Sequence, residues 1–224
     1  MTGRRRTPRH HRSEPETPQP PASGGTAKGE ATRQAILEAA IVRFGRDGYR
    51  RTSVADIARS ARVSGSLAYA YFPNKEALFL AAVDEDAARV IDEGSSTLRD
   101  GSSIDDWRQG LLFSLVIALD RHPLARRLLA GLEPEVTGRV LDIPALAEMR
   151  KAVAERLRLE QIEGQVRDDI DPAELANGIV SIVLSLLMSV VQIGTESALP
   201  YATSVTAVFE AALQVPAPRP GTTR

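Results

Sequence analysis

Residues 44–78 read FGRDGYRRTSVADIARSARVSGSLAYAYFPNKEAL, and this stretch decides the fold. Its apolar side chains recur at the three- and four-residue spacing of a helix face, not in the alternation of a strand. A short helix is predicted after Thr52 or Ser53, because either hydroxyl can cap a first helical turn. The side chains of this helix that should face inward are Val54, Ile57, Ala58 and Ala61.

A tight turn at positions 62–63 separates this helix from the next one, which is predicted from Ser64 to about Tyr71. Pro73 should end that helix, because the residue before a proline is disfavoured in helical conformation. Asn74 is then a good cap for a fourth helix. The stretch therefore predicts two short helices joined by a turn, followed by the start of a longer helix.

The residues upstream predict another helix, because five apolar side chains recur at i, i+1, i+4, i+5 and i+8. They are Ile36, Leu37, Ala40, Ile41 and Phe44. Gly48 should end this helix. Three helices with a tight turn between the second and third have the geometry of a helix-turn-helix, whose third helix lies in the DNA major groove. Spacing alone also allows a three-helix bundle with a purely architectural role.

Residues 32–83 closely resemble the DNA-binding domain of the tetracycline-repressor (TetR-like) family. The likeness is carried by Phe44-x3-Gly48-Tyr49-x2-Thr52-Ser53-Val54-x2-Ile57-Ala58-x2-Ala61-x-Val63-Ser64 and by Tyr69-Ala70-Tyr71-Phe72-Pro73-Asn74-Lys75-Glu76-Ala77-Leu78. The resemblance implies a homodimer of nine or ten helices per subunit, DNA reading by the third helix, and a small-molecule pocket in the C-terminal domain. After residue 83, the number and spacing of the expected helices agree with that family, but no sequence motif of the family is found there.

The sequence departs from the family pattern at two positions. Arg62 stands where the turn glycine is usual, so this arginine is expected to adopt the left-handed conformation. Ser66 stands where the third helix usually has glycine, with Gly65 one place earlier. Because this helix offers few side chains for bidentate base contacts, thymine-methyl contacts and DNA shape should carry more of the specificity.

The predicted third helix has an inner face of Ser64, Ala68 and Phe72, at 100° per residue. The hydroxyls of Tyr69 and Tyr71 can bind phosphates, although each ring could equally be a packing residue. The N-terminus of a helix favours a bound phosphate, and three polar residues are expected beside such ends: Lys75, Thr52 and Ser53. Lys75 could alternatively be a solvated lysine on the surface. The full set of expected DNA contacts is Thr52, Ser53, Ser64, Gly65, Ser66, Leu67, Tyr69, Ala70, Tyr71 and Lys75.

The charge of the chain is strongly divided, although it sums to −1. Residues 1–75 hold 14 Lys and Arg against 6 Asp and Glu, whereas residues 76–224 hold 14 against 23. A basic first third suggests that this end meets a polyanion. Residues 1–28 are too poor in large apolar side chains to fold, so a disordered arm is expected. Its arginines could enter the minor groove of double-stranded DNA or only solubilise the chain; they are Arg4, Arg5, Arg6, Arg9 and Arg12.

The rest of the chain is also helical in period, so the fold class is all-α. Helices are expected at 104–119, 124–132, 144–162, 172–193 and 202–213. The start of the fourth is the best marked, with Asp171 at the cap and Pro172 at the first helical position. The expected organisation is a helix-turn-helix domain at 29–75, a ligand-binding and dimerisation domain at 76–214, and a disordered tail at 215–224.

Residues 175–195 contain no charged side chain and are long enough to be tested as a membrane span. Their serines, glycines and amides, and the lack of nearby Lys or Arg, favour a central helix of a dimer interface over a membrane span. Ser181, Ser185 and Ser189 form a strip of small residues where another helix could approach. With Val208 on the last helix, they are the expected dimer contacts.

Catalytic and metal-binding groups are scarce, so neither an enzyme nor a cofactor or metal site is expected. The chain has no cysteine, which fits a reducing cytosol, and no apolar segment follows its first arginines, so no secretory signal is expected. The spacing of Asp168, Asp169 and Asp171 does not match that of a calcium-binding loop.

Two functions remain open for the chain. It is expected to be a DNA-binding regulator located on the nucleoid in the cytoplasm, and the alternative is an adaptor that binds another protein and has no affinity for DNA. A small-molecule effector is expected to bind in a pocket between the C-terminal helices. The residues expected to line this pocket could equally be ordinary residues of the hydrophobic core; they are Trp107, Leu111, Phe113, His122, Met149 and Met188.

Overall fold

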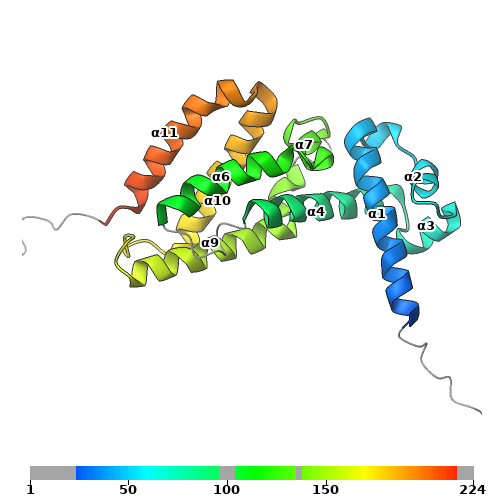
Figure 1. Cartoon of the computed structure of the whole chain (residues 1–224), viewed down its shortest axis with the longest axis horizontal. Helices are drawn as coiled ribbons and strands as arrows, with labels where there is room; N and C mark the ends of the chain where they lie inside the picture. Colours follow the sequence, from blue (N-terminus) through cyan, green and yellow to red (C-terminus); the bar gives the residue numbers. More distant parts are fainter. Residues whose placement is uncertain (1–23, 96–103, 135–137, 216–224) are drawn as a thin grey trace, which may run out of the picture.

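The computed structural model describes residues 24–95, 104–134 and 138–215, and every regular element in these ranges is helical (Figure 1). The elements are α1 (Gly24–Arg51), α2 (Val54–Ser60), α3 (Gly65–Tyr71), α4 (Lys75–Gly94), α6 (Ile104–Leu119), α7 (Pro123–Leu129), the 3-10 helix η1 (Gly138–Asp142), α9 (Pro144–Ile162), α10 (Pro172–Ile193) and α11 (Thr195–Leu213). The prediction of an all-α fold is confirmed. Arg4, Arg5, Arg6, Arg9 and Arg12, and the tail beyond Val215, lie outside the described residues.

Sequence signals for helix ends agree with the structure where the stabilising contact is local. The Asp171 side chain accepts hydrogen bonds from the backbone N–H groups of Ala173 (2.8 Å) and Glu174 (3.3 Å), and Pro172 occupies the first turn. The Asn74 side chain likewise accepts from Ala77 N at 2.8 Å at the start of α4. The bounds predicted for α6, α9 and α10 are those observed.

Three predicted boundaries are wrong. Helix α1 already begins at Gly24, so residues 24–28 of the expected arm are helical, because extending a formed helix costs far less than starting one. Helix α11 begins at Thr195 and contains Pro200, whose missing N–H removes a single helical hydrogen bond. Helix α7 ends at Leu129, three residues early, and η1 was not predicted at all.

The helix-turn-helix and the body are joined by α4 and by α7. Figure 1 shows α2 and α3 at one end of the molecule and α11 at the other, with α4 running from the first end into the body. Helix α4 packs against α1, α6, α7 and α9, and α7 also packs against α1. A Cβ atom on Gly45 would lie 2.9 Å from Leu124 N, so α1 and α7 approach closely there.

The residues next to this contact tie the end of α1 to the body through buried polar groups. Glu133 is 5% exposed, and its Oε1 accepts from Arg127 Nε (2.6 Å) and from Tyr49 N (3.1 Å). The Tyr49 ring lies 4.8 Å from the Phe79 ring of α4 and stacks on Phe44. The helix-turn-helix therefore contacts the body at two places, α4 and α7.

Candidate nucleic-acid interface and effector cavity

The second and third helices of the helix-turn-helix, α2 and α3, each begin at a serine cap. The Ser53 hydroxyl accepts from Asp56 N at 3.1 Å and starts α2, and the Ser64 hydroxyl accepts from Leu67 N at 3.2 Å and starts α3. Thr52, the other predicted cap, is 3% exposed, and its hydroxyl donates to Gly48 O at 2.8 Å. The structure thus places Thr52 inside the domain, and its expected phosphate contact is wrong.

The turn between α2 and α3 has the predicted backbone conformation. Arg62 has a φ of 59°, in the left-handed region that few side chains adopt. The N–H of Val63 donates to Ala58 O at 3.0 Å, which closes the turn. An exposed arginine therefore stands at the tip of the turn, next to the start of α3.

The outer face of α3 is exposed as expected. Leu67 is 39% exposed and Tyr69 53%, and Ser66 and Ala70 are also exposed, while Gly65 is half-buried. Ala68 and Phe72 are buried on the other side. Ser64 was expected on the inner face but is exposed, because a capping residue lies outside the helix and does not follow its 100° phase.

Two of the expected DNA contacts, Tyr71 and Lys75, are already engaged within the domain. Tyr71 is half-buried against the core, and a Cβ atom on Gly29 of α1 would lie 3.5 Å from its hydroxyl. The Lys75 ammonium lies 4.4 Å from the centre of the Tyr49 ring and donates to Arg50 O at 3.4 Å. Both side chains brace the domain, and a phosphate contact would be additional to these interactions.

A carboxylate at the start of α2 was missed in the sequence. The Ser53 hydroxyl donates to Asp56 Oδ2 at 2.6 Å, and Arg59 donates to Asp56 Oδ1 at 2.9 Å. Hydrogen bonds from Ser53 and then from Arg59 lower the pKa of Asp56, so this side chain is ionised at neutral pH. A negative charge at a helix N-terminus competes with a phosphate there, so Ser53 is a weaker phosphate ligand than predicted.

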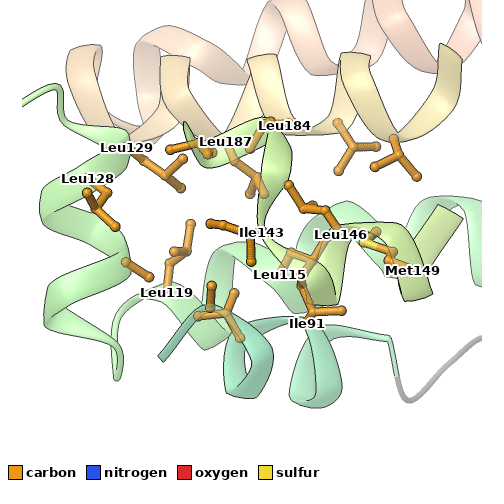
Figure 2. A pocket seen from close by; sticks show the side chains of 16 residues that line it. Ile91, Leu115, Leu119, Leu128, Leu129, Ile143, Leu146, Met149, Leu184 and Leu187 are labelled. Carbon is orange, nitrogen blue, oxygen red and sulfur yellow. The ribbon is translucent and has the colours of Figure 1, made fainter. Parts of the chain in front are cut away.

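The body contains an apolar cavity between α4, α6, α7, η1, α9 and α10. It has a volume of about 580 Å³, its mouth included. Figure 2 shows side chains from these elements converging on it, with no nitrogen or oxygen among the labelled ones. Its wall consists of Ala87, Val90, Ile91, Leu115, Leu119, Ala125, Leu128, Leu129, Val140, Ile143, Leu146, Met149, Val180, Val183, Leu184 and Leu187. A ligand held here meets only hydrocarbon and one thioether.

Of the six residues predicted to line a ligand pocket, Met149 alone lies in the wall of this cavity. Met188 lines a neighbouring pocket with Ser181, Ser185 and Leu141. Phe113 is 68% exposed on the outside of α6, and Trp107 and Leu111 are buried away from the cavity. Trp107, Leu111 and Phe113 therefore lie outside the wall of this cavity.

His122, the sixth residue, has a structural role that the sequence did not show. Its Nδ1 lies 2.8 Å from Asp86 Oδ1 of α4, and its Nε2 lies 3.2 Å from Glu93 Oε1. Asp86 also accepts from Ala125 N at 2.8 Å, so it fastens the first turn of α7 to α4. A hydrogen bond from Arg121, and then one from His122, lowers the pKa of Glu93. His122 therefore holds two helices together and lies outside the cavity wall.

The expected dimer residues lie on α10 and α11, next to a groove whose wall includes Glu174. Ser181 and Ser185 are exposed and Val208 is 61% exposed, whereas Ser189 is half-buried. Each serine hydroxyl donates to the carbonyl four residues earlier, at 2.7 to 3.0 Å, so none presents an unsatisfied donor. Among the described helices, α10 is the one long and apolar enough to cross a membrane, and one third of that apolar segment is buried against the rest of the chain.

Comparison with known proteins agrees with this arrangement. The family model for bacterial regulatory proteins of the tetR family matches residues 36–82. The A-factor receptor protein of Streptomyces griseus is 31% identical over 157 residues, which are 69% of this chain and 53% of that protein. This chain thus spans about half the length of that curated relative.

Solved structures share the fold of almost the whole described chain. A TetR-family transcriptional regulator of Mesorhizobium loti superposes with a TM-score of 0.67 at 22% identity, covering 84% of this chain and 99% of that one. Thermus thermophilus FadR, a TetR-family repressor in complex with lauroyl-CoA, superposes with a TM-score of 0.59 at 22% identity, covering 84% and 99%. The helix-turn-helix of this chain therefore belongs to the tetR family of bacterial regulatory proteins, and the body shares the helical fold of the solved structures.

Proposed function

We propose that this protein is a ligand-responsive transcriptional repressor that binds a palindromic operator as a homodimer. The observation that carries the proposal is the exposed outer face of α3. Ser66, Leu67, Tyr69 and Ala70 stand free of the core there, while Ala68 and Phe72 anchor the helix. A helix presented in this way beside a left-handed turn is the element that other helix-turn-helix proteins insert into the major groove. The protein would act in the cytoplasm, on the nucleoid.

The homodimer is supported by the face of α10 and α11 that the chain leaves uncovered. Gly178, Ile182 and Val208 line a groove between the two helices together with Glu174, and Ser185 is exposed elsewhere on α10. The wall of this groove is mostly apolar or small, apart from Glu174, and such a surface fits a second copy of the same helices. Two copies would also hold two α3 helices at the spacing of one DNA turn, about 34–36 Å.

The effector is expected to be a small molecule whose bound part is largely hydrocarbon. The cavity wall has no hydrogen-bonding side chain, so it cannot compensate for burying a charged or strongly polar group. The relative bound to lauroyl-CoA, whose acyl part is hydrocarbon, supports this class of ligand.

Selection from a random pool of double-stranded DNA tests the proposal without assuming any operator sequence. The full-length protein should enrich an inverted repeat whose half-sites are centred about 10 base pairs or a multiple apart. A matched protein with Leu67→Asp and Ala70→Asp should enrich nothing, because it places two negative charges on the outer face of α3. Failure of the unmodified protein to enrich any sequence would refute DNA recognition and favour an adaptor that binds another protein.

A further inference from the structure

A second pocket lies between α6, α10 and α11, and it differs from the central cavity in carrying charge. Its volume is about 450 Å³, open solvent included, and only Val183 also lines the central cavity. The wall of this pocket consists of Arg108, Leu112, Val183, Leu186, Val205, Thr206, Phe209 and Glu210. An apolar surface is therefore combined with one cationic and one anionic side chain.

Arg108 is the cationic side chain of this wall, and it has an unused donor. Its side chain is 15% exposed, and one terminal nitrogen donates to Glu160 Oε2 at 2.8 Å. Its Nε is buried and has no hydrogen-bond partner, the one such side-chain atom found among the residues that the structure describes. Leaving a buried donor unpaired is costly, and native structures contain few such groups.

The carboxylate that faces Arg108 is shared with other donors. Glu160 is 2% exposed and also accepts from Arg156 Nε at 2.9 Å and from Trp107 Nε1 at 2.7 Å. One buried carboxylate thus accepts hydrogen bonds from two guanidinium groups and from the indole of Trp107. Glu210 also lines the pocket, but its side chain is exposed to solvent.

We propose that this pocket binds a small amphipathic carboxylate, with its head group at Arg108 and its apolar tail among Leu112, Leu186 and Phe209. A guanidinium group pairs with a carboxylate through parallel hydrogen bonds, and such charge-assisted bonds are about twice as strong as neutral ones. The head group would supply an acceptor to Arg108, and the tail would cover the apolar wall. The site is distinct from the central cavity, which offers no partner for a charge.

Calorimetric titration of the full-length protein with octanoate, octanol and octylamine tests the head-group preference. Octanoate should bind at least about tenfold more tightly than the other two, which have the same tail. The fluorescence of Trp107, the single tryptophan of the chain, should change on octanoate binding because its indole shares Glu160 with Arg108. Equal affinities for the three probes, or no octanoate binding, would overturn the proposal.

Single substitutions in the two pockets test which of them binds octanoate. Arg108→Gln should weaken octanoate binding about ten- to hundredfold while leaving octanol binding unchanged. Leu112→Phe fills the pocket and leaves every residue of the ion cluster in place, so it should weaken octanoate binding even if Arg108→Gln fails to fold. Val180→Phe narrows the central cavity alone and serves as the matched control. Octanoate binding that Val180→Phe abolishes and Leu112→Phe leaves intact would place the ligand in the central cavity and refute the assignment.

Discussion

At the scale of the residue, Gly48 shows how one position connects the DNA-binding end to the body. Its φ is 80°, and a Cβ atom there would lie 2.5 Å from Arg127 and 2.8 Å from Glu133 Oε1. Gly48→Ala should therefore lower the free energy of unfolding by about 2 kcal/mol or more, from left-handed strain and from the clash with a buried ion pair. Urea unfolding of the variant and of the unmodified protein measures this loss.

Gly65 is the matched control for that experiment. It lies in the first turn of α3, its φ is not positive, and no atom lies within 4 Å of where a Cβ would be. Gly65→Ala should leave stability unchanged or raise it by up to about 1 kcal/mol, because alanine favours a helix. Equal losses for Gly48→Ala and Gly65→Ala would contradict the role given to the contact with Arg127 and Glu133.

The two tyrosines of α3 should respond differently to truncation. Tyr69 is 53% exposed on the outer face, so Tyr69→Ala should weaken binding to a selected DNA duplex while thermal stability stays within about 0.5 kcal/mol. Tyr71 packs on the core next to α1, so Tyr71→Ala should destabilise the protein by about 1–3 kcal/mol. Fluorescence anisotropy and thermal melts separate the two effects. Unchanged DNA affinity in Tyr69→Ala would remove this residue from the proposed interface.

At the scale of the element, α1 and α4 are held together by ions as well as by the apolar core. Arg89 of α4 donates to Glu38 of α1, and also to Glu85 on its own helix. Hydrogen bonding from Arg89 lowers the pKa of Glu38 below its ordinary 4.5, and the two carboxylates raise the pKa of Arg89. A carboxylate with a depressed pKa stabilises the fold above its unfolded value, and this contribution disappears as the pH falls through the folded value.

The pH dependence of stability should therefore include a contribution from Glu38. The unmodified protein is expected to lose this contribution to its free energy of unfolding progressively below about pH 4.5. The Glu38→Gln variant lacks the carboxylate, so its stability should not include this contribution at any pH. Because the Glu38 side chain is 50% exposed, the difference should be below about 1 kcal/mol. Urea unfolding at pH 7 and pH 3.5 gives the comparison. The same loss of stability in both proteins between these pH values would show that the ion pair does not contribute.

At the scale of the whole molecule, the proposed dimer gives a direct test. Ser185 is exposed on α10, and an arginine there would place an unpaired charge in the contact between two copies. Burying such a charge costs several kcal/mol, so Ser185→Arg should shift the protein to monomer and abolish binding to a palindromic duplex. Sedimentation at micromolar concentration measures the shift.

Gln165→Arg is the control for the dimer, because it adds the same charge at an exposed loop position between α9 and α10. This variant should sediment and bind DNA as the unmodified protein does. If the unmodified protein sediments as a monomer, the homodimer is refuted. If Ser185→Arg remains fully dimeric, the interface lies on another face.

Features that depend on neighbours along the chain could be predicted from the amino-acid sequence. Helical period and side-chain caps predicted the all-α fold and the cap at Asp171, because both rest on contacts within a few residues. The outer face of α3 followed in the same way from the phase of one helix. The orientation of Ser64 was not predicted correctly, because this residue precedes the helix and does not follow its 100° phase. The left-handed turn at Arg62 was predicted from the family resemblance, in which this position is usually glycine.

The tertiary structure alone decided which of these residues are available to a ligand. Thr52 and His122 look like free polar groups in the sequence, yet packing of one helix on another buries both and gives them internal partners. The central cavity could not be predicted, because its leucines, isoleucines and valines have the same chemistry as ordinary core residues. Whether such side chains meet each other or leave a space depends on how five helices and a 3-10 turn, distant in sequence, pack together.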